Sequence, residues 1–401
     1  MERFFFKKLI TSILIVLIIF GLSITNLINN YKPIIDTVEA QKDISISNSI
    51  KNIDASIKDN TYGKYAFIDF YGYLQKLMDK NEESNFEVVK DDNGTLHYTF
   101  FGDKANPVYE LVKRTEALKN GLKDESVKFA YIMPPDKYYK GYSNLPYGIP
   151  YNYANETADS FLDLLKQNNI DTIDLRENLA ESGIEPKDLF FKTDHHWKTE
   201  TAFWEFGQLA NTLKNKYGAN IEDIDFYTNK DNYNFITYKD SYVGSMGRKT
   251  GIPYSGVDDF TLIYPKFNTD YTYYSKTGEQ ETNLKGRFEE ALITISPFRT
   301  NKGVYALEGD KYSSYLFGNQ GIVHVVNKKV PNGPKILFVK DSYTVALAAF
   351  LSTVCSDIYM VDPRYYTGSI PEYIDSVKTD FVFVSFYPQD LTEDFFRFYD
   401  K

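Results

Sequence analysis

The stretch "TDHHW", residues 193–197, places an aspartate beside two of the chain's four histidines. In an extended segment, residues i and i+2 point the same way, so Asp194 can accept a hydrogen bond from His196 while His195 faces away and packs. A carboxylate that orients a histidine is the base half of a nucleophile triad. The pattern therefore predicts that His196 is a general base and that Asp194 holds its tautomer.

The same residues allow two other interpretations. Asp194, a histidine and Glu200 could bind a metal ion, although His196 precedes the expected helix and the chain has neither an HExxH pattern nor a set of cysteines. The motif could also be purely structural. We predict that the site uses no metal and no cofactor.

A nucleophile is predicted at Ser342, within "ILFVKDSYTVALAAF". An apolar strand pattern precedes this serine and a helix pattern follows it, which places it at the carboxyl end of a strand, where α/β proteins carry their sites. The helix would direct free N–H groups toward a developing oxyanion. Alternatively, Asp341 or Ser342 only caps the helix. The catalytic interpretation is favoured because the second motif supplies its base.

Strands and helices alternate around both motifs. Strands are predicted at 127–133, 170–175, 335–339, 356–362 and 381–387, and helices at 155–169, 199–218 (with Thr199 as N-cap), after Ser342 and at 371–377. This alternation predicts an α/β fold with a mainly parallel sheet covered on both faces. Residues 219–300, rich in Tyr, Asn, Asp and Lys, are predicted to form an irregular β-containing insertion that lines one wall of a cleft.

The N-terminus predicts a membrane anchor. Arg3, Lys7 and Lys8 precede an apolar run from Leu9 to Ile28, and about 20 helical residues span a bilayer core. The basic flank should stay in the cytoplasm, which places the rest of the chain outside it. A cleaved signal peptide is the alternative, although no small-x-small cleavage site follows the run.

The predicted organisation is therefore an anchor at 1–30, a stalk or linker at 31–60 and a catalytic domain at 61–401. The net charge of −10 argues against nucleic acid or an anionic membrane surface as the main partner. Aromatic residues make up 16% of the chain, including 34 Tyr, which suits stacking against sugar rings but could also reflect genome composition. A single Cys355 excludes an internal disulfide.

"TDHHW", "ILFVKDSYT" and "IYMVDPRYY" together resemble the DHHW family of bacterial surface proteins, which is related to the SGNH-like proteins that O-acetylate alginate and other exported polysaccharides. The resemblance covers most of the chain after about residue 60, including "VGSMGRKTGIPY" at 243–254. It implies an SGNH-hydrolase-like α/β/α sandwich and a triad of Asp194, His196 and Ser342. The motif order Asp, His, Ser is that of the alginate-type proteins.

Other site residues are harder to transfer. Lys340 stands where relatives often have glycine, and the oxyanion Gly and Asn of SGNH proteins could correspond to Gly318 and Asn319 in "YLFGNQG". Tyr343 and Arg364 are further candidates for oxyanion or substrate contacts. Arg364 could equally be an exposed loop charge.

The resemblance implies an extracytoplasmic O-acetyltransferase that moves an acetyl group through acetyl-Ser342 to hydroxyls of an exported or cell-wall polysaccharide. A membrane-bound O-acyltransferase would be the partner that supplies acetyl groups, because acyl-CoA is absent outside the cell. A carbohydrate acetylesterase with the same triad and a non-catalytic glycan-binding surface protein are the alternatives.

Overall fold

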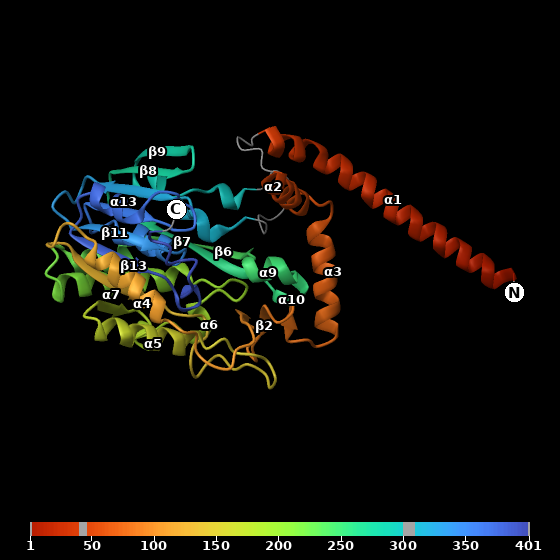
Figure 1. Ribbon diagram of the computed structural model, residues 1–401, viewed down its shortest axis with the longest axis horizontal. Helices are drawn as coiled ribbons and strands as arrows, with labels where there is room; N and C mark the ends of the chain where they lie inside the picture. Colours follow the sequence, from red (N-terminus) through yellow and green to blue (C-terminus); the bar gives the residue numbers. More distant parts are fainter. Residues whose placement is uncertain (1, 40–45, 300–308, 400–401) are drawn as a thin grey trace.

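In the computed structural model, which describes residues 2–39, 46–299 and 309–399, an eight-stranded sheet runs through the centre of the folded body (Figure 1). The strand order is β5-β4-β13-β11-β12-β10-β8-β9. Pairing is parallel from β5 to β12 and antiparallel from β12 through β10 and β8 to β9. The strands are β4 (Lys128–Met133), β5 (Asp171–Asp174), β8 (Tyr271–Thr277), β9 (Gln280–Gly286), β10 (Ile322–Asn327), β11 (Lys335–Lys340), β12 (Asp357–Val361) and β13 (Phe381–Ser385).

Two smaller sheets and the helices surround the central sheet. The small sheets contain β1 (Glu82–Glu83), β2 (Val88–Lys90) and β3 (Leu96–Tyr98), and β6 (Tyr233–Tyr242) with β7 (Asp258–Pro265). The α-helices are α1 (Glu2–Glu39), α2 (Ile46–Asp59), α3 (Lys64–Leu77), α4 (Tyr109–Asn120), α5 (Ala154–Gln167), α6 (Pro186–Leu189), α7 (Thr199–Asn215), α8 (Ile224–Thr228), α9 (Ser245–Thr250), α10 (Ile252–Ser255), α11 (Phe288–Ala291), α12 (Thr344–Leu351) and α13 (Ile370–Ser376). Short 3-10 helices are η1 (Leu179–Ser182), η2 (Lys230–Asn232), η3 (Ser296–Phe298), η5 (Lys311–Ser314) and η6 (Pro388–Asp390).

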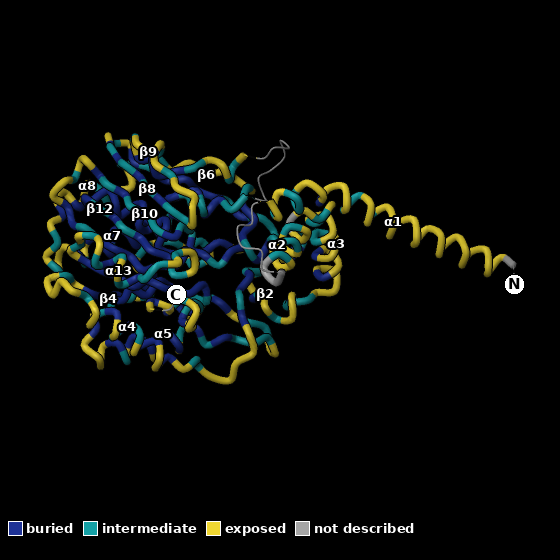
Figure 2. Tube along the Cα trace, turned by 45° about the horizontal axis from the view of Figure 1, so that its top comes forward, coloured by how far each residue is buried: buried dark blue, intermediate teal, exposed yellow. Residues whose placement is uncertain are grey.

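The central strands are apolar on both faces, so helices must cover both. Along β11, Ile336 and Phe338 join one hydrophobic core, and Leu337 and Val339 join the other. The first core includes side chains of α7 and α12, and the second those of α4, α5 and α13. Figure 2 shows this buried interior beneath an exposed outer layer. The predicted α/β fold with a mainly parallel sheet is confirmed.

One detail of the predicted helices is wrong. The helix that contains Phe203 begins at Thr199, but its N-cap is Lys198. The hydroxyl of Thr199 donates instead to the backbone carbonyl of Thr261 in β7. A tertiary hydrogen bond thus takes the place of the local cap that the residue type suggests.

The predicted insertion at 219–300 contributes to the central sheet itself, through β8 and β9, while β6 and β7 form a separate ribbon. Residue 300 lies outside the described part of the chain. The segment therefore extends the sheet beyond its parallel half and also places β7 and the start of α9 beside the "TDHHW" loop. Asp258 of β7 accepts the N–H of Thr193, and Ser245 of α9 donates its N–H to Asp194.

Helix α1 is long and apolar enough to cross a membrane or to serve as a signal sequence. It continues past the predicted boundary at residue 30 as far as Glu39. Residues 40–45 of the predicted linker lie outside the described residues, and α2 follows and packs against α1. In Figure 1, α1 projects away from the folded body.

Candidate active site

Ser342 lies in the turn that joins β11 to α12, at the carboxyl end of the strand. The turn is held by Asp341, whose carboxylate accepts the N–H groups of Tyr343 (2.8 Å) and Tyr387 (2.6 Å). Ser342 makes no cap for α12, because its hydroxyl is directed to His196 instead. The helix-cap interpretation therefore does not apply to this serine, which is only 9% exposed.

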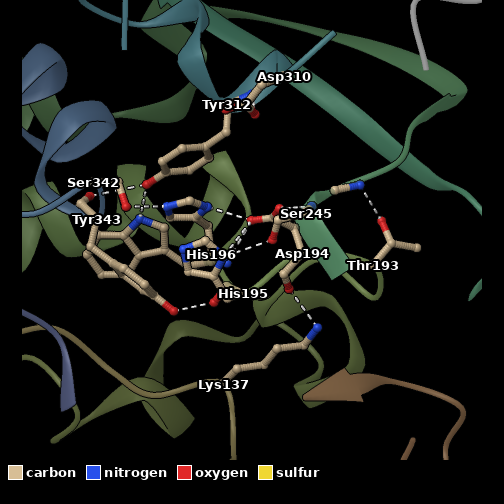
Figure 3. A network of polar contacts seen from close by, with 12 residues as sticks. Lys137, Thr193, Asp194, His195, His196, Ser245, Asp310, Tyr312, Ser342 and Tyr343 are labelled. Atoms are coloured by element: carbon tan, nitrogen blue, oxygen red, sulfur yellow. Dashed lines mark hydrogen bonds and ion pairs between the residues drawn. The ribbon is translucent and has the colours of Figure 1, made fainter. Parts of the chain in front are cut away.

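Three side chains form a continuous chain of hydrogen bonds (Figure 3). Asp194 Oδ1 lies 2.5 Å from His196 Nδ1, and His196 Nε2 lies 2.7 Å from Ser342 Oγ, across 146 positions of the sequence. A carboxylate can only accept, so Nδ1 carries the proton and Nε2 is the acceptor that faces the serine hydroxyl. The tautomer is the one that a general base requires.

Asp194 is held from several sides. Its Oδ2 accepts the N–H of Ser245 at 2.6 Å, and its Oδ1 also accepts the N–H of His196 at 3.1 Å. Burial acts to raise the pKa of Asp194, but the neighbouring histidines and these hydrogen bonds outweigh it and hold the pKa well below its usual value. The carboxylate therefore stays ionised and orients the imidazole.

The predicted orientation of His195 is wrong. Its Nδ1 lies 3.2 Å from Ser245 Oγ and 3.5 Å from Asp194 Oδ1, and its ring centroid lies 3.8 Å from that of His196. Residues 192–196 form a series of bends, closed by the bridge between Phe190 and Trp197, so the side-chain alternation of an extended strand does not apply. Burial lowers the pKa of His195 to about 3, which leaves this ring neutral.

Aromatic residues hold the imidazole ring of His196 in place. The ring of Tyr312 stacks on His196 at 3.8 Å and 13°, and its hydroxyl accepts the indole N–H of Trp197 at 2.8 Å. The same hydroxyl donates to the carbonyl of Tyr343 at 3.2 Å, beside the serine turn. Tyr312 therefore connects the two motifs, and sequence reasoning missed it because tyrosine is abundant and nothing nearby singles it out.

Two further contributors were also missed as site residues. Gly244 approaches Asp194 so closely that an added Cβ would lie 2.1 Å from Asp194 Cβ. Lys137, which follows β4, donates to the carbonyl of Asp194 at 2.6 Å, and burial lowers its pKa to about 8. Gly244 and Ser245 could have been found from the stretch "VGSMGRKTGIPY", which is part of the family resemblance. No sequence pattern pointed to Lys137.

Lys340 and Arg364 share one buried carboxylate. Lys340 Nζ lies 3.0 Å from Asp362 and 2.8 Å from the side-chain oxygen of Asn319, and Arg364 binds both oxygens of Asp362 at 2.9 and 2.7 Å. The side chain of Lys340 thus links the end of β11 to Asp362 and Asn319. The side-chain oxygen of Asn319 points toward Lys340. The Arg364 side chain is 29% exposed and is held rather than free in its loop.

The backbone donors near the serine are unequally available. Gly318 donates its N–H to the carbonyl of Tyr315 (2.9 Å), and Tyr343 donates its N–H to Asp341, so neither N–H is free for an oxyanion. These two N–H groups therefore do not support an oxyanion role, and Gly318 and Tyr343 as oxyanion or substrate contacts stay a prediction. The N–H of Ser342 itself has no hydrogen-bond partner among the described residues.

The cluster could also be viewed as a metal site, since ligand atoms of Asp194, His195 and His196 lie within 4.8 Å of one another. Both ring nitrogens of His196 already have partners, however, so a metal would have to replace a hydrogen bond of the triad. Glu200 is not part of the cluster. Its carboxylate lies 3.2 Å from the hydroxyl oxygen of Thr199.

A pocket of about 500 Å³ lies at the same edge of the sheet, beyond β4 and β5. Its lining includes Tyr138, Tyr139, Tyr151 and Arg176. Asp136, also in the lining, accepts a hydrogen bond at 2.8 Å from Gln389. Gln389 lies two positions after Tyr387, whose N–H donates to Asp341 of the serine turn. The pocket is therefore connected to the triad by a short chain of contacts.

Comparison with known proteins agrees with this architecture. Residues 101–233 match the sequence model of a family described as the SGNH hydrolase-like domain of the acetyltransferase AlgX. No curated protein matches the chain.

Solved structures are similar in fold over most of the chain. Bacillus cereus PatB1 is 21% identical, with a TM-score of 0.61, over 78% of this chain and 99% of PatB1, and its structure with a sulfonyl adduct gives the same TM-score. A DHHW family protein from Eubacterium siraeum is 20% identical, with a TM-score of 0.56, over 77% of this chain and 93% of that one. The expected resemblance is confirmed: residues 101–233 are similar to the SGNH hydrolase-like domain of AlgX, and the fold is shared with a DHHW family protein.

Proposed function

We propose that this protein is an extracytoplasmic O-acetyltransferase that moves an acetyl group through Ser342 to hydroxyls of an exported or cell-wall polysaccharide. The observation that carries the proposal is the continuous hydrogen-bond chain from Asp194 through His196 to Ser342. The match of residues 101–233 to an acetyltransferase domain supports acetyl as the transferred group.

In the first half-reaction, Ser342 Oγ attacks the carbonyl carbon of an acetyl donor while His196 Nε2 takes its proton. The negative charge passes to the carbonyl oxygen, and the imidazolium that forms is stabilised by the ionised Asp194. Collapse of this intermediate expels the donor's leaving group, which receives the proton from Nε2. Acetyl-Ser342 remains.

In the second half-reaction, an acceptor hydroxyl gives its proton to His196 Nε2 and attacks the acetyl carbon. Ser342 leaves and regains the proton, and an acetylated product departs. The free N–H of Ser342 is positioned to donate to the oxyanion in both steps, together with the N-terminal end of α12. Asn319, whose oxygen is fixed by Lys340, remains our proposed side-chain donor, and Arg364 a proposed substrate contact.

The pocket lined by Tyr138, Tyr139 and Tyr151 is the proposed place for acceptor sugar rings. Tyrosine offers an apolar face for the ring and a hydroxyl for its polar edge. Helix α1 would keep the domain at the outer face of the membrane, where a membrane-bound O-acyltransferase would supply acetyl groups.

The test uses the full chain in detergent with a chromogenic acetyl ester, and it compares wild type, Ser342→Ala and His196→Ala. Turnover and a trapped acetyl adduct on Ser342, absent in both variants, would support the triad, and a sulfonyl fluoride should modify the same residue. Added oligosaccharides that accelerate deacylation and become acetylated indicate a transferase; acetate release alone indicates an esterase. Folded protein with no turnover and no adduct would leave the glycan-binding alternative.

A further inference from the structure

Helix α3 presents an exposed face that is almost entirely apolar or aromatic. Phe70 is 62% exposed and Leu77 64%. The other large exposed side chains on α3 and at its end are Tyr65, Phe67, Tyr71, Tyr73, Leu74 and Met78. The structure describes every residue of α3, and Lys76 is the one exposed charged residue among them. Such a continuous exposed apolar patch marks an interaction site.

The opposite face of α3 packs tightly against the folded body. Gly72 is buried, and an added Cβ there would lie 2.2 Å from the carbonyl oxygen of Thr250. Asp69 accepts the N–H of Ile252 at 2.8 Å, at the start of α10. The exposed face therefore belongs to a helix in a fixed position, not to a loosely attached segment.

The start of α3 is also tied to the candidate membrane span. The N–H of Tyr62, two residues before α3, donates to the side chain of Asn26 in α1 at 2.8 Å. Asn26 lies near the end of the apolar run of α1, whose side chains from Phe4 to Ile28 are largely exposed. Figure 1 shows α3 at the margin of the folded body on the side from which α1 projects. With α1 in a bilayer, α3 is held at the level of its surface.

We propose that the exposed face of α3 binds the interfacial region of the lipid bilayer. Phenylalanine and leucine side chains would enter the boundary with the acyl chains, and tyrosines would lie at the headgroups, as such side chains do in interfacial helices. A lipid surface fits this face better than a protein partner, because the start of α3 is hydrogen-bonded to the candidate membrane span and the face carries almost no charge.

This placement has a consequence for the candidate active site. Helix α9, which α3 contacts, begins at Ser245, and the N–H of that residue holds Asp194. A membrane-bound α3 would therefore set the position of the triad relative to the bilayer through a short and tightly packed connection.

The test places the purified full chain in vesicles of phosphatidylcholine and phosphatidylglycerol. A Phe70→Cys variant carries an environment-sensitive fluorophore, and a Ser160→Cys variant on α5 is the matched exposed control. Cys355 remains unlabelled, since it is buried and its pKa is raised by burial. Leu77→Cys provides a second position on the same face, in case the label at residue 70 disturbs folding.

We expect the emission from positions 70 and 77 to fall about twofold when the lipids carry bromine on their acyl chains, because interfacial helices insert about 5–10 Å. The label at 160 should be unaffected by brominated lipid and quenched by aqueous iodide. Equal iodide quenching at all three positions, without bromine quenching, would overturn the proposal. Protection of positions 70 and 77 from both quenchers would also overturn it, since protein, such as a second copy of the chain, would then cover the face.

Discussion

Gly244→Ala should impair catalysis without changing any member of the triad. The added Cβ would lie 2.1 Å from Asp194 Cβ and 2.5 Å from Asp194 Oδ2, whereas ordinary contacts begin at 3.4 Å. Gly244 has φ −74°, which any residue adopts, so the effect is steric and not one of backbone strain. The two segments must separate by more than 1 Å, and that movement acts directly on the carboxylate that orients His196.

A displacement of about 1 Å at a catalytic group reduces the rate on the order of 100-fold, which corresponds to about 2.7 kcal/mol in the activation free energy. The assay is kcat/KM for a chromogenic acetyl ester, measured beside the thermal unfolding midpoint. Gly207→Ala in α7 is the matched control, because the added Cβ would meet the side chain of Thr228 in α8 at an ordinary distance of 3.6 Å. That control should keep full activity.

A folded Gly244→Ala protein with wild-type kcat/KM would contradict this expectation. Such a result would mean that the loop around Asp194 yields by more than 1 Å without losing the alignment of His196. A loss of activity in Gly207→Ala of similar size would also refute it, since the loss would then not depend on contact with Asp194.

Three further outcomes are expected. Asp194→Asn should lower kcat/KM about 10³- to 10⁴-fold in the ester assay, because an amide can stabilise the wrong tautomer of His196; an unchanged rate would exclude its orienting role. Tyr312→Phe should lower the free energy of unfolding in urea by about 1–3 kcal/mol, because the buried indole N–H of Trp197 loses its acceptor; no change would mean that water replaces the hydroxyl. Glu205 in α7 is buried, and burial raises its pKa from 4.5 to about 9. Between these two pKa values the carboxyl group is ionised in the unfolded chain but neutral in the folded protein. The free energy of unfolding is therefore unaffected by Glu205 below about pH 4.5 and falls as the pH rises toward 9. Relative to Glu205→Gln, wild type should lose about 1.4 kcal/mol of unfolding free energy per pH unit between about pH 5 and 9, measured by urea unfolding. A difference in unfolding free energy between the two proteins that stays the same at every pH would contradict this.

Much of the fold could be predicted from local patterns. Each of the predicted strands at 127–133, 335–339 and 381–387 matches an observed strand of the central sheet. Apart from Lys128, Lys335 and Ser385, these runs are apolar, since both faces of their strands are buried, and turn residues bound them. Local patterns did not reveal that β8 and β9 would extend the same sheet, because alternating polar strands do not specify their partners.

The candidate site was only partly predictable. Asp194, His196 and Ser342 were identified from two motifs, and the geometry that joins them came with the structure. His195 lies on the side of Asp194 and His196, contrary to the prediction, because the chain bends at residues 192–196 where an extended segment was expected. Gly318 was a plausible donor by residue type, and only the turn geometry showed that its N–H is already bonded to Tyr315.

Local sequence is sufficient to predict the strand and helix periods, the apolar N-terminal helix and the residue types of the triad, because these depend on neighbours a few positions apart. Tertiary structure decided which residues meet. The order of β11 between β12 and β13, the stacking of Tyr312 on His196 and the close approach of Gly244 to Asp194 all depend on segments far apart in the chain. Such contacts follow from the packing of whole elements around shared cores, which no local pattern encodes.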